Sequence, residues 1–326
     1  MRIIKQLFGS LLLLSLFSSC SNDVDIYADY KDISIVYGIM DSSDDTTWLK
    51  ITKAFQGPGN ALLFATNPDS SNYDYKLDVK MVGVKNGVEK QTIVFDTITI
   101  KNKHAGDSVF YYPNQIVYYS TEVLDVEYKY ELVIIREDGE ITSETKIVDD
   151  FYVTYPNRSI DFKNNNKEIE WNSAANGKRY EVSFKFNYKE LLPGSSDTTI
   201  QSVSWNLAGA VRSSSLAGGE NMYKAYSGDE FYSILENELE VILNVQRWAI
   251  DVDIIIPSAT QDFDTYLEVN QGADNLLSEV PIYTNIDGGI GLFASRKTIV
   301  KSAALSAGSE LKLVVEYPDL GFKPRN

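Results

Sequence analysis

The feature that most constrains this chain is a period-two alternation of apolar and polar residues, which begins at Ile33 and recurs in short segments separated by turn residues. Such alternation places every second side chain on one face of an extended strand, so it predicts half-buried β-strands. The segments are rich in β-branched and aromatic residues, which favour strands. The strands predicted in the first half of the chain are 33–40, 47–55, 76–84, 90–100, 114–123, 127–137 and 140–148.

Two dipeptides mark tight turns between these strands. Asn86-Gly87 and Asp138-Gly139 each separate two alternating segments, and both pairs are typical of type I′ hairpin turns, which need positive φ at the two central residues. Residues 56–73 carry Gly, Pro, Asn and Ser in a pattern that predicts a long loop. Short strands at this spacing are typical of an immunoglobulin-like β-sandwich.

Residues 155–157 are the predicted joint between two domains, and the period changes later, after the loop marked by Gly218-Gly219. Apolar residues then recur at helical spacing through residues 228–244, and Ser227 with Glu230 has the spacing of a capping box, so one amphipathic helix is predicted there. The other segments of this half alternate with period two again. Their predicted strands are 168–173, 179–188, 199–211, 248–256, 290–301 and 310–317.

These patterns predict a mainly β chain with two β-sandwich domains of immunoglobulin or fibronectin type, the second with one amphipathic helix. We expect a signal peptide over residues 1–19, a tether over 20–32, the first sandwich over 33–154 and the second domain over 155–326. A length of 326 residues suits two domains of ordinary size, and 44% apolar residues are enough for two cores.

The first twenty residues resemble a bacterial lipoprotein signal. Arg2 and Lys5 precede an apolar run, residues 7–17, which has the length of a signal h-region and is too short to span a bilayer. The run ends in Leu-Phe-Ser-Ser-Cys, which resembles a lipobox, and Cys20 is the only cysteine of the chain. We therefore expect acyl chains on Cys20 to anchor the protein to a membrane.

The charge balance limits the classes of partner that the protein is expected to bind. Lys and Arg number 30 against 46 Asp and Glu, a formal net charge of −16. Because phosphate contacts need clustered cations, we expect no nucleic-acid partner. An acidic body is repelled by anionic headgroups, so the lipid alone is expected to hold the protein at the membrane. Asp23 and Asp25 partly resemble the acidic export signal of surface lipoproteins of Bacteroidota. We expect the outer membrane and favour its outer face, with the periplasmic face left open.

Candidate catalytic residues are few in this chain, and we expect that the protein is not an enzyme. His104 is the only histidine, and it lies in a loop context without a G-x-S-x-G nucleophile motif. Glu168 with Glu170, and Asp251 with Asp253, are pairs two residues apart on predicted strands. Alternation explains both pairs as solvent-facing positions, although two facing acids are also what glycoside hydrolysis requires.

Two further pairs of acidic residues are candidate ligands for a metal ion. Asp44-Asp45, and Asp262 with Asp264, fall in expected loops, where their oxygens could ligate Ca²⁺. Neither pair belongs to a complete D-x-D-x-D-G loop. We therefore expect no metal site and no cofactor, with Ca²⁺ as the alternative left open.

Neighbouring aromatic residues indicate a candidate binding face. Tyr111-Tyr112 and Tyr118-Tyr119 place adjacent rings on opposite faces of an extended chain, so one ring of each pair must point outward. The chain has 21 Tyr, and Tyr is a favoured contact residue at protein interfaces. We select Tyr111, Tyr112, Tyr118 and Tyr119 as the candidate face, with packing inside a sandwich as the alternative.

Two stretches carry a resemblance to a family. One comprises residues 34–40 and 47–55, and the other is 280–293, which contains Asn285-Ile286-Asp287-Gly288-Gly289. With the lipobox they resemble the Bacteroidota lipoproteins collected as domain of unknown function 4249. The resemblance implies a lipobox followed by a β domain and a mixed β domain, at the outer membrane. It also implies genes near those of TonB-dependent receptors, and it implies no catalytic residues.

Three functions remain open at this point. The favoured one is a non-catalytic, lipid-anchored envelope or cell-surface protein that binds a partner, as an accessory component of an outer-membrane receptor such as a TonB-dependent receptor. The first alternative is a fimbrillin-like structural subunit, although no Arg lies between Cys20 and Arg136 for the maturation cleavage that this class resembles. The second alternative is a glycan-active hydrolase with two acids about 5–10 Å apart.

Overall fold

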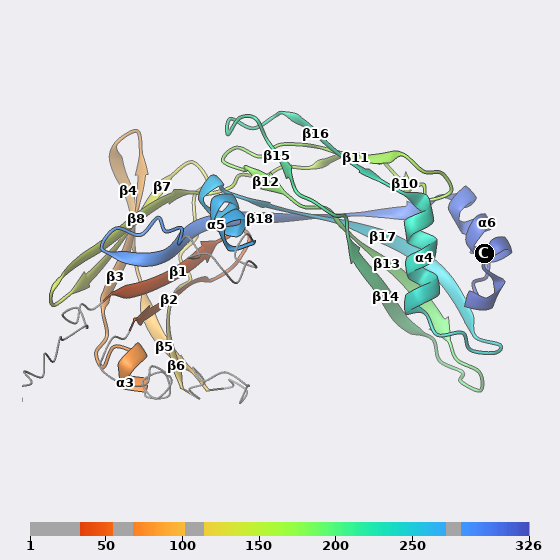
Figure 1. Ribbon diagram of the computed structural model, residues 1–326, viewed down its shortest axis with the longest axis horizontal. Helices are drawn as coiled ribbons and strands as arrows, with labels where there is room; N and C mark the ends of the chain where they lie inside the picture. The colour runs from red at the N-terminus through yellow and green to blue at the C-terminus, as the bar shows by residue number, and fades with distance from the viewer. Residues whose placement is uncertain (1–32, 55–67, 102–113, 272–281, 326) are drawn as a thin grey trace, which may run out of the picture.

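The computed structural model describes residues 33–54, 68–101, 114–271 and 282–325. The signal peptide, the tether, Cys20, His104, Tyr111 and Tyr112 of the sequence predictions lie outside the described residues. Within the described part the chain is mainly β, as predicted, and it forms two lobes joined by long strands (Figure 1).

One sheet runs through both lobes, in the order β14-β13-β17-β18-β1-β2-β6-β5, with β10, β12 and β15 paired at its margins. Its strands are β1 (Ser34–Met40), β2 (Thr47–Lys53), β5 (Asp96–Ile100), β6 (Gln115–Ser120), β10 (Ser159–Ile160), β12 (Arg179–Tyr180), β13 (Ser183–Leu191), β14 (Thr199–Asn206), β15 (Val211–Arg212), β17 (Gln246–Ala259) and β18 (Gly289–Leu305).

A smaller sheet faces each half of this long sheet. In the N-terminal lobe its order is β4-β3-β7-β8, and in the C-terminal lobe it is β16-β11-β9. The strands are β3 (Asp78–Lys85), β4 (Val88–Val94), β7 (Lys129–Arg136), β8 (Gly139–Lys146), β9 (Val153–Tyr155), β11 (Lys167–Asn172) and β16 (Asn221–Tyr226).

Strand β18 connects the lobes. Its residues 289–295 run parallel to β1 in the N-terminal lobe, and its residues 296–303 run antiparallel to β17 in the C-terminal lobe. The N-terminal lobe therefore takes a central strand from near the end of the sequence. Sheet pairing thus crosses the boundary that the sequence predicts between residues 154 and 155.

Each lobe has its own core between two layers. The N-terminal core is built from inward residues of β1, β2, β3, β7 and β8, and Ile286 and Phe293 complete it. The C-terminal core is aromatic, with the ring of Phe162 stacked on Phe231 at a centroid distance of 4.3 Å and edge-on to Phe184 at 5.6 Å. A two-layer arrangement explains the alternation, because every second side chain of a facing strand enters a core.

The helices of the described C-terminal half are α4 (Gly228–Glu238), α5 (Gln261–Gln271) and α6 (Ala307–Glu316), followed by the 3-10 turn η3 (Pro318–Leu320), and α3 (Pro68–Ser71) is one turn in the N-terminal half. The prediction of a single helix is therefore wrong. Helix α4 begins where predicted but ends at Glu238, and Leu239 is extended. Its last turn carries acids and no base, which opposes the helix dipole.

The predicted capping box of α4 is also wrong. The side chain of Ser227 makes no hydrogen bond to the helix. Instead, Asn165 Oδ1 accepts from the backbone N–H of Asp229 at 3.1 Å and from the hydroxyl of Ser227 at 2.9 Å. A side chain from a distant loop therefore satisfies the first turn of the helix.

The predicted strand 310–317 is helix α6. Ser306 caps this helix by accepting from the N–H of Ser309 at 3.1 Å. Leu313 is buried, whereas Leu311 and Val315 are 62% and 64% exposed. Leu311, Leu313 and Val315 alternate in the sequence, but they do not share one face of a sheet. The strand prediction is wrong because two of these three apolar residues face solvent.

One of the two predicted type I′ turns is confirmed, and the other is wrong. Asn86 and Gly87 have φ of 54° and 74°, which confirms the first type I′ hairpin. The second hairpin forms, but β7 and β8 pair Arg136 with Gly139, so its turn residues are Glu137 and Asp138 and neither has positive φ. The type I′ prediction is wrong there because the loop begins one residue earlier.

Candidate partner-binding face

Tyr118 and Tyr119 on β6 point to opposite faces of the long sheet. Tyr118 is 3% exposed in the N-terminal core, where its hydroxyl accepts from the backbone N–H of Leu77 at 3.0 Å and burial raises its pKa. Its selection as a binding residue is therefore wrong. Tyr119 lies on the outer face, where its ring meets Trp48 of β2 at a centroid distance of 5.6 Å.

Cross-strand register identifies the other residues of this outer face, because residues directly opposite each other share a face. Trp48 lies opposite Tyr119, and Ile98 on the outer strand β5 lies opposite Val117, which shares the face of Tyr119. The exposed fractions are 47% for Trp48 and 47% for Ile98. We call the following six residues the aromatic–aliphatic face: Tyr37, Ile39, Trp48, Ile98, Ile100 and Tyr119. Two charged residues lie among them on the same face: Lys50 opposite Tyr37, and Asp96 opposite Tyr119.

Helix α5 borders this face. Leu292 and Ala294 of β18 are the register partners of Tyr37 and Ile39, but they are buried, and α5 contacts β18. Tyr266 of α5 meets Tyr37 edge-on at a centroid distance of 6.2 Å. The hydrogen bond between the two hydroxyls, together with burial, raises the pKa of Tyr37 to about 12. The outer face is thus covered over β18, whereas five of the six residues of the aromatic–aliphatic face, on β1, β2 and β5, are exposed.

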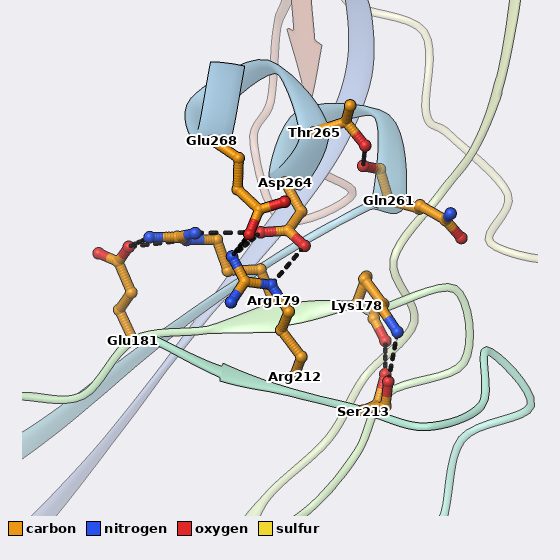
Figure 2. Close-up of polar contacts among 10 residues, drawn as sticks. Lys178, Arg179, Glu181, Arg212, Ser213, Gln261, Asp264, Thr265 and Glu268 are labelled. Carbon is orange, nitrogen blue, oxygen red and sulfur yellow. Dashed lines mark hydrogen bonds and ion pairs between the residues drawn. The ribbon is translucent and has the colours of Figure 1, made fainter. Parts of the chain in front are cut away.

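An ion-pair network holds α5 in place (Figure 2). The carboxylate of Asp264, which is 4% exposed, accepts from Arg179 of β12 at 3.0 Å and from Arg212 of β15 at 2.7 Å. Arg179 also pairs with Glu181, and Arg212 with Glu268 of α5. Burial raises the pKa of Asp264, but the hydrogen bonds and charges of the two arginines outweigh it, so the net pKa is lowered.

Two of the acidic pairs selected from the sequence have partners within the protein, whereas Glu168 and Glu170 of β11 are both exposed, as their alternation predicts. Asp264 and Asp262 lie in helix α5 rather than in a loop, and Asp262 accepts from the hydroxyl of Tyr283 at 2.5 Å. On β17, Asp251 and Asp253 both accept from the side-chain amide of Asn187, at 2.8 and 3.0 Å. Within the described ranges, no group of three His, Cys, Asp or Glu side chains is placed to hold a metal ion.

The two stretches that carry the family resemblance lie side by side, because β1 and the first part of β18 are parallel neighbours. Asn285 stabilises this contact: its amide donates to the carbonyl of Phe293 at 2.7 Å and its oxygen accepts from the N–H of Phe293 at 2.9 Å. Asp287 exchanges two backbone hydrogen bonds with Thr142 of β8. This segment therefore joins the two sheets of the N-terminal lobe, and its role here is structural.

A cleft of about 850 Å³ lies where the β3–β4 hairpin approaches the C-terminal lobe. It is lined by charges of both signs, and two of its three lysines form ion pairs: Lys85 with Glu127, and Lys129 with Glu131 and Glu144. The third, Lys146, is exposed on β8. Because most of its cations are paired within the protein, we do not select this cleft as a site for a charged ligand.

A scan against protein-family models finds no match for this chain, and a search of the curated proteins also finds none. In the part of the chain that the structure describes, no helix has the length and apolar character needed to cross a membrane.

Proposed function

We propose that this chain is a non-catalytic lipoprotein of the outer membrane, anchored by acylated Cys20, whose body binds another envelope protein through the aromatic–aliphatic face. The observation that carries the binding proposal is the grouping of six aromatic and aliphatic side chains on one sheet face, five of them exposed, with Lys50 and Asp96 among them. Exposed apolar side chains gathered on one face are unfavourable in water, and on a monomer such groups mark contact surfaces. The lipobox of residues 16–20 supports the anchor.

The composition and rigidity of this face suit a protein partner. Trp and Tyr supply large contact areas and are enriched at interfaces. Trp48 and Tyr119 already contact each other, and both lie on strands of a continuous sheet, so binding immobilises few side chains. The resemblance to receptor-associated lipoproteins favours an outer-membrane receptor, such as a TonB-dependent receptor, as the partner.

The anchor is tested by the variant Cys20→Ser. We expect radiolabelled palmitate to label the parent protein and not the variant, and the variant to move from the membrane pellet to the soluble fraction. The physical reason is that acyl chains contribute about 0.8 kcal/mol for each buried CH₂, and the serine cannot carry them by the same route. The matched control Ser18→Ala should keep both label and pellet. A Cys20→Ser protein that still sediments with envelopes contradicts the proposal.

The binding face is tested by photo-crosslinking in intact cells. A photoreactive phenylalanine analogue at Trp48 should give one defined adduct, whereas the same analogue at Tyr223, which is 61% exposed on β16 of the other lobe, should give none. Adding Ile98→Glu to the Trp48 probe should weaken the adduct about tenfold, since an unpaired charge would be buried at the interface. Equal adducts from both probes, or an adduct unaffected by Ile98→Glu, contradict this assignment.

A further inference from the structure

A second surface lies where the two lobes meet, on the edge of β18 that faces away from β17. Along this edge β1 pairs with residues 289–295, and β10 pairs with Ala304 and Leu305. Between them, no described strand pairs with this edge of residues 296–303. A strand edge without a neighbour presents N–H and C=O groups that can pair with another chain.

The pairing at the end of this gap fixes the direction of its backbone groups. The N–H of Ala304 donates at 3.0 Å to the chain leading into β10. Alternate residues of a strand direct their backbone groups to the same edge, so those of Thr298, Val300 and Ser302 point into the gap. The register with β17 is regular over this stretch, with no bulge to reverse the order.

An apolar hollow of about 480 Å³ lies beside the free edge. Its other wall is β9, the outer strand of the facing sheet, so the seam between the two layers of the C-terminal lobe is open here. Tyr152 and Val300 are 65% and 60% exposed at this seam. A strand added to β18 would direct alternate side chains toward this hollow. The hollow is lined by Phe151, Tyr152, Val153, Ile299, Val300 and Lys301.

The seam is also basic, although the chain is acidic overall. Arg296 and Lys301 lie on β18, and Arg158 leads into β10. None of these three forms an ion pair with an acid of the described ranges, whereas the neighbouring Lys297 pairs with Asp150. Lys301 lies on the side of the hollow and donates to the carbonyl of Val153 at 3.1 Å, and Arg296 lies on the opposite, exposed face of β18. Cations without acidic partners beside a free edge complement carboxylates on an incoming segment.

We propose that this seam is a strand-addition site for an extended acidic segment of a partner protein, separate from the aromatic–aliphatic face. The segment would pair with the backbone of β18 between β1 and β10, with its apolar side chains toward the hollow and its carboxylates on the other face of the sheet, near Arg296. A second copy of this chain fits less well. The outer strands of the long sheet are β5 and β14, of which β14 has no acid, and two bodies of net charge −16 repel each other.

The test uses the full-length acylated protein in detergent micelles and two fluorescent nonapeptides, one alternating valine with glutamate and one alternating valine with lysine. We expect the acidic peptide to bind in fluorescence polarisation and the basic peptide not to bind. Val300→Pro should weaken binding of the acidic peptide at least about tenfold, because it removes an N–H that points into the gap but no hydrogen bond to β17. The matched control Val300→Thr keeps the N–H and should bind as the parent does.

A second variant keeps the proposal testable if the proline destabilises the strand. Arg296→Glu should weaken binding of the acidic peptide at least about tenfold while leaving the backbone edge intact, because it places a carboxylate opposite the carboxylates of the peptide. No binding of the acidic peptide, equal binding of both peptides, or binding unchanged in these variants overturns the proposal. A concentration-dependent dimer that Val300→Pro abolishes overturns it in favour of a second copy. Crosslinking at Trp48 does not depend on Val300, so failure of this proposal and failure of the proposed function are distinguishable.

Discussion

Replacement of Gly291 by alanine is expected to lower the free energy of unfolding by about 4 kcal/mol. Gly291 has φ of 126°, a conformation that residues with a Cβ rarely adopt, and it lies opposite Val36 in the parallel pair of β1 and β18. A Cβ at this position would lie 1.9 Å from the carbonyl oxygen of Val36. Because the obstacle is backbone, the two strands must separate, which would open the pairing of β1 with β18. Urea unfolding measures the loss.

Gly139 provides the matched control for this prediction. Its φ is 150°, and a Cβ built there meets no atom within 4 Å. Gly139→Ala should therefore introduce backbone strain without a steric clash, and it should lower the free energy of unfolding by about 1–2 kcal/mol. If the two alanine variants unfold at the same urea concentration, the close approach of β1 to β18 is not what requires glycine at position 291.

The strands could be predicted from the sequence where each one faces a core. Alternation located β1, β3, β7 and β13 because one face of each strand packs on a second layer. It could not reveal that β18 pairs with β1, since that contact joins segments near opposite ends of the sequence. The single prediction of a strand at 90–100 also hid a change of sheet: Phe95 is buried between β4 and β5, which belong to different sheets.

The pattern of apolar residues also fails to predict a helix or strand that polar contacts fix in place. Helix α5 was missed because its buried position is a carboxylate, Asp264, whose partners are arginines on two other strands. The sequence indicates only part of the candidate face. Alternation required one ring of Tyr118-Tyr119 to point outward, but only the register of β2 with β6 brings Trp48 beside Tyr119. The periodicity of one segment indicates which of its faces is apolar, and it does not indicate which distant strand lies beside it.

The arginine-bound carboxylate that fixes α5 leads to the second large effect. Asp264→Ala is expected to lower the free energy of unfolding by about 3 kcal/mol at neutral pH, because it leaves Arg179 buried with only its exposed partner Glu181. The folded pKa of Asp264 is lowered, so its stabilisation is complete above the ordinary aspartate pKa and is lost as the pH falls through the folded value. The difference between parent and variant should therefore shrink below about pH 4.

Glu268 provides the comparison that separates a buried ion pair from an exposed one on the same helix. Its side chain is 54% exposed and pairs with Arg212, so Glu268→Gln should change stability by less than about 1 kcal/mol. Amide hydrogen exchange should show faster exchange of α5 in Asp264→Ala and no change in Glu268→Gln, since Asp264 bridges β12 and β15 whereas Glu268 pairs with β15. Because α5 places Tyr266 against Tyr37, loosening it should also disturb the border of the aromatic–aliphatic face. Equal effects of the two variants would show that burial of Asp264 contributes nothing beyond a surface ion pair.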